Sequence, residues 1–122
     1  MPRLQADQVK KIAADLLAGA GAPAVEAKIV ASHSVEANLT GHDSHGIIQI
    51  PSYIDRIEKG HIVPGAPIDI ISDTPTTTVV DGNWGFGYVV TEDVMRRTIE
   101  KARTQNVAAA TVYRQGHVGR VA

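Results

Sequence analysis

The chain contains no cysteine and few aromatic residues. The absence of cysteine excludes disulfide bonds, thiolate catalysis and zinc sites built on thiolates, and it is compatible with a reducing compartment. Phe, Trp and Tyr together make up 4% of the 122 residues, whereas hydrophobic residues of all types make up 43%. We therefore expect a core built mainly from Ala, Val, Ile and Leu, in a chain whose length suits one globular domain.

A strong net charge and long apolar runs are also absent. The formal net charge is -1 at pH 7, which gives no electrostatic reason to expect nucleic acid or an anionic membrane as a partner. No apolar run is as long as a membrane span, and the start Met1-Pro2-Arg3-Leu4 lacks the apolar stretch of a signal peptide. We therefore expect no membrane association and a cytoplasmic location.

Helical periodicity dominates residues 1–62, which we expect to form an N-terminal helical part. Apolar residues recur at helical spacing over Val9–Leu17, and a second helix is expected over Ala27–Asn38, with mostly small residues on one stripe. Such a stripe would let a neighbouring helix approach closely, which fits dimer packing or a helical interaction module. A third helix is expected over Ile47–Gly60, which Pro51 either starts or kinks.

An extended pattern takes over in residues 63–122. The expected elements are strands around Ile68–Ile70 and over Thr76–Val80, a turn at Asp81-Gly82, a helix over Val89–Ala102, a strand over Val107–Tyr113 and a helix that opens after Arg114–Gly119. The fold class predicted from this order is α+β: a helical part followed by the start of a mixed α/β sheet domain that is not of the Rossmann type.

The segment Gly41–Ile47 puts two imidazoles, a carboxylate and a hydroxyl into one short turn between two helical patterns. That composition is typical of a reactive site, but simpler interpretations exist. Asp43 and Ser44 precede a helical pattern, where their oxygens could cap backbone N–H groups. His42 and His45 have the spacing of some metal ligands, yet a metal site needs at least a third ligand, so we assign no metal.

A second candidate is His117, which lies between Gly116 and Gly119 after a predicted strand. If a helix starts here, its outward N–H groups could hold an anion or a carbonyl oxygen, and an imidazole could exchange a proton near neutral pH. An ordinary loop histidine is the alternative. His33 and His61 have no partner by spacing, so we expect them to be structural or exposed.

The glycine-rich segment Gly82–Gly87 does not match a Rossmann fingerprint. Starting from Gly85-x-Gly87, the third required glycine position is occupied by Val90. These glycines are therefore expected to serve a turn and close packing against a helix.

Several of these segments together resemble a known family, and they span the whole chain. They are Asn38-Leu39, Gly41–Gly46, Ile50–Tyr53, Asp81-Gly82, Gly85–Gly87 and Gly116–Arg120. In this order they resemble the malate/L-lactate dehydrogenase family of NAD(P)-dependent 2-hydroxyacid oxidoreductases, which is distinct from the Rossmann-type enzymes of similar name. Members are considerably longer, so the chain matches only their N-terminal part.

The resemblance implies a 2-hydroxy or 2-oxo acid substrate, NAD or NADP as cofactor, and a homodimer. It also implies that His117 acts on the substrate oxygen and borders the nicotinamide together with Val118 and Gly119, while Ser44 and His45 supply an active-site hydroxyl and a proton donor. Either histidine could transfer the proton; we favour His117. Most cofactor contacts would come from residues beyond Ala122.

One position departs from the family pattern, because Gln49 stands where many members have arginine. A guanidinium can bind a substrate carboxylate through two hydrogen bonds, whereas a neutral amide contact is weaker by roughly 1 kcal/mol. Gln49 is thus a candidate substrate contact that disfavours a small dicarboxylate such as malate. Two alternative functions stay open: a non-catalytic helical interaction module, and a metal-dependent hydrolase using His42, Asp43 and His45.

Overall fold

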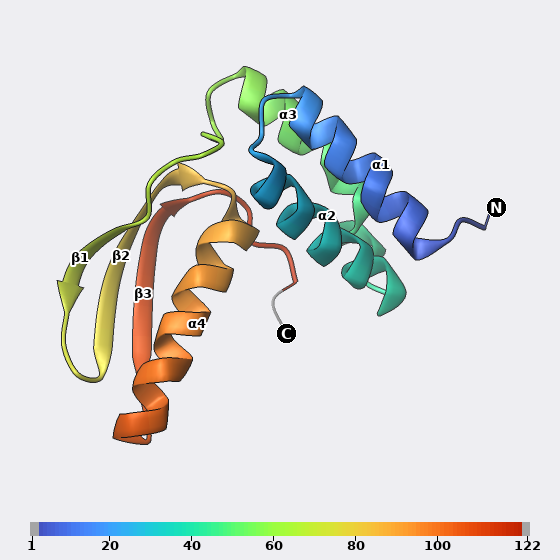
Figure 1. Cartoon of the computed structure of the whole chain (residues 1–122). Helices are drawn as coiled ribbons and strands as arrows, with labels where there is room; N and C mark the ends of the chain where they lie inside the picture. The colour runs from blue at the N-terminus through green and yellow to red at the C-terminus, as the bar shows by residue number, and fades with distance from the viewer. Residues whose placement is uncertain (1–2, 121–122) are drawn as a thin grey trace.

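The computed structural model describes residues 3–120 and shows a helical half followed by a half built on a small sheet (Figure 1). Two short 3-10 turns, η1 and η2, connect the second and third helices. The elements are α1 (Ala6–Gly19), α2 (Ala24–Leu39), η1 (Asp43–His45), η2 (Ile47–Gln49), α3 (Ile50–Glu58), β1 (Asp69–Asp73), β2 (Thr77–Gly85), α4 (Gly87–Gln105) and β3 (Ala109–Gln115). The predicted α+β class is confirmed.

The helical half is organised around α2, which is the most buried helix. Its small side chains, including Ala27, Ala31 and Ser34, are buried and let both α1 and α4 approach. The small-residue stripe is therefore used inside this chain, so it no longer supports a dimer surface or an interaction module on α2. Pro51 lies in the first turn of α3 and starts that helix rather than kinking it.

The sheet has the order β1-β2-β3. β1 pairs with β2 in antiparallel orientation, whereas β2 and β3 are parallel and are connected through α4. A parallel pair needs such a crossover, and α4 packs against β2 and β3 as Figure 1 shows. Val80 on β2 and Val90 and Val94 on α4 form a small buried cluster between the two layers.

The predicted turn at Asp81-Gly82 is wrong, because β2 continues through both residues to Gly85. The chain accommodates the irregularity with Asn83 and Trp84, whose φ angles are +47° and +61°, and the pairing of β2 with β3 shifts register between Asp81 and Gly85. A bulge of this kind bends a strand without ending it. The Asp81-Gly82 pair therefore marks a bulge within β2 and does not end the strand.

The segment after β3 also differs from the prediction. Residues 116–120 are irregular and form no helix within the described part of the chain, and residues 121 and 122 lie outside it. The expected strand-to-helix exit at His117 is therefore not present in residues 116–120. No helix N–H groups are therefore available in residues 116–120 to hold an anion or a carbonyl oxygen beside His117.

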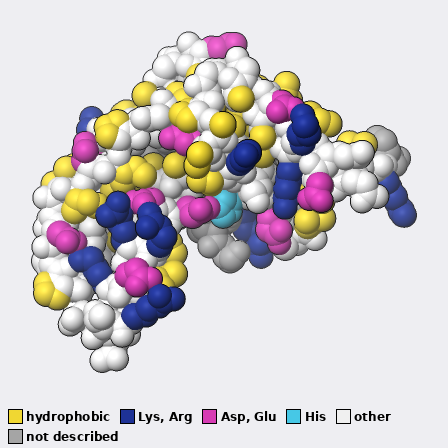
Figure 2. All heavy atoms as spheres, viewed as in Figure 1, with side chains coloured by type: hydrophobic (Ala, Val, Ile, Leu, Met, Phe, Trp, Pro, Cys, Tyr) yellow, Lys and Arg dark blue, Asp and Glu magenta, His cyan; other side chains and the backbone are white. Residues whose placement is uncertain are grey.

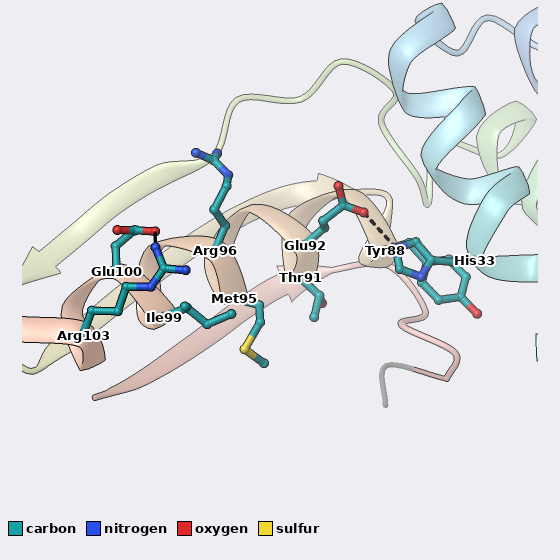
Figure 3. Close-up of a pocket in the computed structure, with 9 residues that line it drawn as sticks. All are labelled: His33, Tyr88, Thr91, Glu92, Met95, Arg96, Ile99, Glu100 and Arg103. Atoms are coloured by element: carbon teal, nitrogen blue, oxygen red, sulfur yellow. Dashed lines mark hydrogen bonds and ion pairs between the residues drawn. The ribbon is translucent and has the colours of Figure 1, made fainter. Parts of the chain in front are cut away.

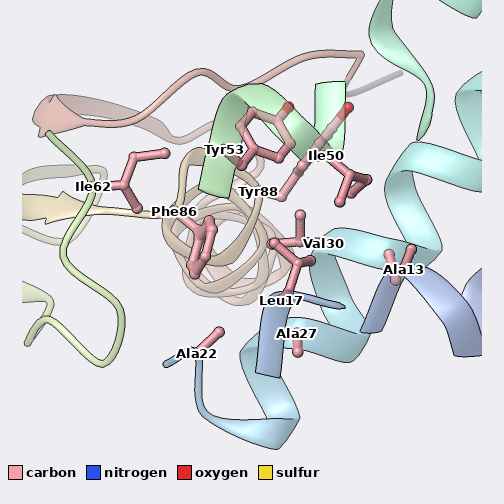
Figure 4. Packing of buried hydrophobic residues seen from close by; sticks show 11 residues of the cluster. Ala13, Leu17, Ala22, Ala27, Val30, Ile50, Tyr53, Ile62, Phe86 and Tyr88 are labelled. Carbon is pink, nitrogen blue, oxygen red and sulfur yellow. The ribbon is translucent and has the colours of Figure 1, made fainter. Parts of the chain in front are cut away.

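One hydrophobic cluster joins the two halves (Figure 4). It contains Leu17 from α1, Tyr53 from α3 and Ile62 from the segment after α3, together with Phe86 and Tyr88 from the sheet half. The division predicted at residue 62 stays a prediction, and this cluster extends across it.

On the face drawn in Figure 2 the surface is hollowed between the halves, and basic and acidic side chains gather together over the sheet half. No helix within residues 3–120 has both the length and the apolar character needed to cross a membrane.

Candidate active site

The turn between α2 and α3 is folded around the side chain of Asn38. Its amide nitrogen donates to the Asp43 carboxylate at 2.7 Å, and its carbonyl oxygen accepts from the Ile47 backbone nitrogen at 2.9 Å. Gly46 lies so close that an added Cβ would collide with the Asn38 amide. Asp43 therefore stabilises the turn through Asn38, and the capping interpretation of Asp43 is wrong.

Ser44 and His45 are held at the outer side of this turn. The Ser44 hydroxyl lies 3.0 Å from Nδ1 of His45, and neither η1, η2 nor α3 has a side-chain hydrogen bond at its cap. The interpretation of Ser44 as a helix cap is therefore also wrong. Ser44 is exposed and His45 half-buried, so the pair can meet a small molecule from solvent.

His117 follows β3 and reaches the same place from the sheet half. Its ring centroid lies 5.5 Å from that of His45, which itself lies 4.0 Å from the ring of His42. Nδ1 of His117 is 3.0 Å from the hydroxyl of Tyr53 on α3. Three imidazoles and a phenol from three segments therefore lie together, and the two predicted catalytic histidines are neighbours.

The backbone of His117 is positioned by glycine at the start of α4. A Cβ on Gly87 would collide with the carbonyl oxygens of Gly116 and His117, so only glycine lets the helix and this segment approach so closely. This confirms that the Gly82–Gly87 segment serves close packing. We expected a helix start after β3 to position His117. Contact with α4 positions it instead.

The surroundings of His117 and Tyr53 favour the uncharged forms of both side chains. Burial lowers the pKa of His117 below its usual 6.5, and the nearby His45 and Arg56 lower it further by repulsion. Burial also raises the pKa of the Tyr53 phenol, with a further contribution from Tyr88. At neutral pH the His117 imidazole is therefore largely uncharged, and Tyr53 keeps its proton.

Gln49 lies at the base of the same turn. Its side-chain amide donates to the Ser44 backbone carbonyl at 2.8 Å, and the residue is half-buried. This position is close to Ser44 and His45, as a substrate contact requires, but the observed bond also gives Gln49 a purely structural role. Its binding role stays a prediction.

Val118 and Gly119, the predicted cofactor contacts, come directly after His117 in a half-buried stretch. Gly119 has a φ of +68°, and a Cβ there would collide with the Tyr88 hydroxyl. That hydroxyl donates a long hydrogen bond to the His45 carbonyl, at 3.4 Å, and accepts one from the Arg120 backbone N–H, at 3.3 Å. Tyr88 thus ties the segment that carries His117 to the turn that carries His45.

Sequence reasoning missed the roles of Asn38, Tyr53 and Tyr88. The signal that could have found the tyrosines is their rarity: the chain has only three tyrosines, and two of them contact this cluster. An aromatic residue that carries a hydroxyl is commonly retained where its polar end has a partner. No comparable signal marks Asn38, because its partners are set by the shape of the turn.

His33 was expected to be structural or exposed, and the structure gives it a structural setting. Its ring stacks on Tyr88 with centroids 4.8 Å apart, and Nε2 bonds the Glu92 carboxylate at 2.8 Å. These residues form one end of a pocket along α4 that also contains Met95 and Ile99 (Figure 3). None of the predicted site residues lines that pocket, which shares only Tyr88 with the surroundings of the histidine cluster.

The metal-dependent hydrolase receives no support from the geometry. The Asp43 carboxylate is bonded to the Asn38 amide, and no group of three or more His, Asp or Glu side chains within residues 3–120 is arranged to hold a metal ion. The cluster instead places imidazoles beside the hydroxyl groups of Ser44 and Tyr53, and such groups can exchange protons.

Comparison with known proteins places the chain in a family. Residues 4–122 match the family model described as malate/L-lactate dehydrogenase. Hydroxycarboxylate dehydrogenase B of Escherichia coli O157:H7 is 39% identical over 101 residues, covering 83% of this chain and 28% of that protein. L-sulfolactate dehydrogenase of Methanocaldococcus jannaschii is 37% identical over 116 residues, covering 95% of this chain and 34% of that protein.

The fold agrees with solved structures of similar proteins. Malate dehydrogenase from Pyrococcus horikoshii OT3 superposes with a TM-score of 0.94 at 30% identity, covering 97% of this chain and 34% of that one. The chain belongs to the malate/L-lactate dehydrogenase family, and the expected resemblance is confirmed. It spans about a third of the length of these relatives.

The residues present fit only one end of a nicotinamide dinucleotide. The approaches that glycine permits at Gly82 and Gly87 are filled by the chain's own backbone, from Arg114 and from residues 116 and 117. They leave no cradle for a diphosphate. The half-buried stretch from His117 to Gly119, beside His45, could border the nicotinamide ring, because that part needs a surface next to the proton-exchanging group.

Proposed function

We propose that the protein is an NAD(P)-dependent dehydrogenase that interconverts a 2-hydroxy acid and its 2-oxo acid, and that this chain supplies the acid–base half of the active site. Family membership supports the reaction class, since the similar proteins named above are hydroxycarboxylate, sulfolactate and malate dehydrogenases. The observation that carries the proposal is the convergence of His45 and His117, with 5.5 Å between their ring centroids, from segments far apart in the sequence.

The chemistry requires one group to exchange a proton with the substrate oxygen and another to polarise that oxygen. When bound, the nicotinamide would accept the hydride from the substrate carbon or return it. His45 and His117 are the pair available for the proton and for the polarising hydrogen bond, and Ser44 orients His45 through its Nδ1. A carboxylate outside this chain could complete the relay.

The choice of substrate rests on Gln49. Because it is neutral and its amide lies at the base of the Ser44 turn, we propose a substrate with one carboxylate, of the hydroxycarboxylate type, in preference to a dicarboxylate such as malate. Whether the cofactor is NAD or NADP would be set by residues outside this chain. We also propose a homodimer in the cytoplasm; no feature of α2 supports the dimer, because its small-residue face is buried within the chain.

The test is a comparison of His117→Ala and His45→Ala in the full-length enzyme. Loss of a positioned acid–base group lowers kcat by roughly a hundredfold or more, whereas loss of a group that only positions the substrate acts mainly on KM. Because both proposed roles, proton exchange and polarisation of the substrate oxygen, act in the transition state, we expect kcat to fall in both variants. A change confined to KM in one variant would assign that histidine to positioning alone. Lys11→Ala, which removes a solvent-exposed cation on α1, serves as the control. Unchanged kcat and KM in both histidine variants would contradict the proposed function.

A further inference from the structure

The Tyr53 hydroxyl is a polar group of a buried residue beside the histidine cluster. The residue is 2% exposed, and its hydroxyl lies 3.0 Å from Nδ1 of His117. Within residues 3–120 this is the hydrogen bond that the hydroxyl makes, and Nε2 of His117 has no protein partner there. The direction of this single bond therefore decides which ring nitrogen of His117 carries the proton.

Two directions are possible, and they satisfy the groups unequally. If Nδ1–H donated to the phenol oxygen, the buried phenol proton would have no acceptor, which costs free energy. If the phenol donates to Nδ1, its proton is satisfied and the imidazole proton lies on Nε2, where it can meet solvent or a ligand. The second arrangement leaves no buried donor without a partner, so it is favoured.

We propose that Tyr53 is a positioning residue that holds neutral His117 in the tautomer protonated at Nε2, so that His117 donates a hydrogen bond to the substrate oxygen. The proton is then exchanged by His45, in place of the His117 that the sequence favoured. The division of roles rests on the proposed function; the tautomer does not. An imidazole whose Nε2 already bears hydrogen has no lone pair there to accept the hydroxyl proton of a 2-hydroxy acid. His45, with Ser44 at its Nδ1, has a hydroxyl that can either donate or accept, so its tautomer is free to change during proton exchange.

The polarising role is consistent with the surroundings of His117. Its half-buried ring lies beside His45 and Arg56, both of which disfavour a charged imidazolium. A neutral donor aimed at a carbonyl oxygen stabilises the negative charge that develops there when a hydride is added to the adjacent carbon. Tyr53 contributes without touching the substrate, because it fixes which nitrogen presents the proton.

The decisive measurement is the tautomer of His117 in the full-length protein labelled with 15N-histidine. Two-bond and three-bond 1H–15N correlations, recorded above the titration of the ring and assigned with His117→Gln, distinguish the two neutral forms. We expect protonation at Nε2 in the unmodified protein, and in Tyr53→Phe a mixture in which the other form gains population. Protonation of His117 at Nδ1 in the unmodified protein would overturn the proposal, and this measurement requires neither folding of a variant nor turnover.

Steady-state kinetics provide the second readout. Tyr53→Phe keeps the ring in the core and removes the hydrogen bond, so we expect kcat for 2-oxo acid reduction to fall about three- to tenfold with KM nearly unchanged. Tyr113→Phe on β3 is the matched control and should keep normal kinetics. An unchanged kcat in Tyr53→Phe, in an active enzyme, would overturn the positioning role. An inactive enzyme with the expected tautomer would instead contradict the proposed function and leave the tautomer established.

Discussion

At the scale of single residues, His117 owes its character to what surrounds it. An exposed histidine changes charge near neutral pH, but here burial, the neighbouring His45 and the guanidinium of Arg56 all oppose the charged form. Arg56 is exposed, so its repulsion is partly screened by solvent and salt. The uncharged state of His117 is therefore set by several moderate effects, which can be removed one at a time.

We predict that Arg56→Gln raises the pKa of His117 toward 6.5, because it removes a positive charge that disfavours the imidazolium. If the neutral ring is the active form, activity should then begin to decline at a higher pH as the solution is acidified. NMR titration of the histidine and the acid limb of kcat/KM report both effects. Lys59→Gln removes a cation nearby on the chain, from a residue that bonds Asp55, and should leave the titration in place. A pKa that falls in Arg56→Gln would contradict the prediction.

Gln49 allows a test of substrate choice at the same scale. Gln49→Arg should shift preference toward substrates with a second carboxylate, by roughly 1 to 3 kcal/mol in kcat/KM, because a guanidinium can bind a carboxylate through two charge-assisted bonds. Relative kcat/KM values for malate and a lactate-type substrate measure the shift. Gln49→Met, which removes the amide without adding charge, should produce no such preference. Equal substrate ratios in the arginine variant and the parent would assign Gln49 the structural role alone.

At the scale of elements, the start of α4 controls where the segment after β3 lies. Gly87 is buried at the first position of the helix, and the carbonyl groups of residues 116 and 117 occupy the space that a side chain would need. The helix therefore does more than connect β2 to β3. It supports the backbone from which the His117 ring reaches the turn after α2.

We predict that Gly87→Ala destabilises the protein by about 1 to 3 kcal/mol, as overpacking of a filled contact does, and also lowers kcat because His117 is displaced. Gly19→Ala is the matched control: Gly19 is the last residue of α1, and nothing lies within 4 Å of its added Cβ. That change should be neutral or stabilise by up to about 1 kcal/mol. Urea denaturation and steady-state kinetics measure the two effects. Equal stability changes in both variants would show that the close approach at Gly87 is not required.

The elements were predictable where periodicity alone decides them. α1, α2 and α4 were expected because their apolar residues repeat at helical spacing, and β3 because Val107–Tyr113 is an extended apolar run. The continuation of β2 past Asp81 was missed because the Asp81-Gly82 pair is a typical turn signal. The left-handed backbone angles of Asn83 and Trp84 instead form a bulge within the strand. Local signals cannot show that a strand continues through a bulge.

The site was predictable only in part. Ser44, His45 and His117 were singled out by composition and family resemblance, and the structure brings them together, but their roles stay predictions. The bond between Tyr53 and His117 could not be foreseen, because it exists only when the helical half docks on the sheet half. The helix expected after His117 was wrong for residues 116–120, since a Gly-rich exit from a strand does not specify the conformation of the next residues.

At the scale of the whole molecule, the candidate site lies where two halves of the chain meet. Their shared core includes Tyr53 and Tyr88, each of which also bonds a residue or backbone group of the histidine cluster. The same side chains thus hold the halves together and shape the site. Changes that loosen this core should therefore disturb the geometry of the cluster before the chain unfolds.

We predict that residues 1–122 expressed alone show no dehydrogenase turnover with NAD or NADP. The approaches at Gly82 and Gly87 are filled by the chain's own backbone, and the chain spans about a third of its relatives. The hydride donor would therefore lack a fixed position next to the substrate. The assay is the absorbance of the reduced nicotinamide with several 2-hydroxy acids. The full-length enzyme is the positive control, and steady turnover by residues 1–122 would contradict the prediction.

The third strand also has a consequence for how the polypeptide behaves in solution. β3 pairs with β2 along one side, and within residues 3–120 no strand pairs with its other side. Val107 and Tyr113 are 70% and 42% exposed, and Val107–Tyr113 contains neither a charge nor a proline. An open edge with unpaired backbone groups and such a composition is a template for pairing between molecules. For residues 1–122 expressed alone, this open edge favours association that increases with protein concentration. A lysine introduced into β3 would reduce such pairing.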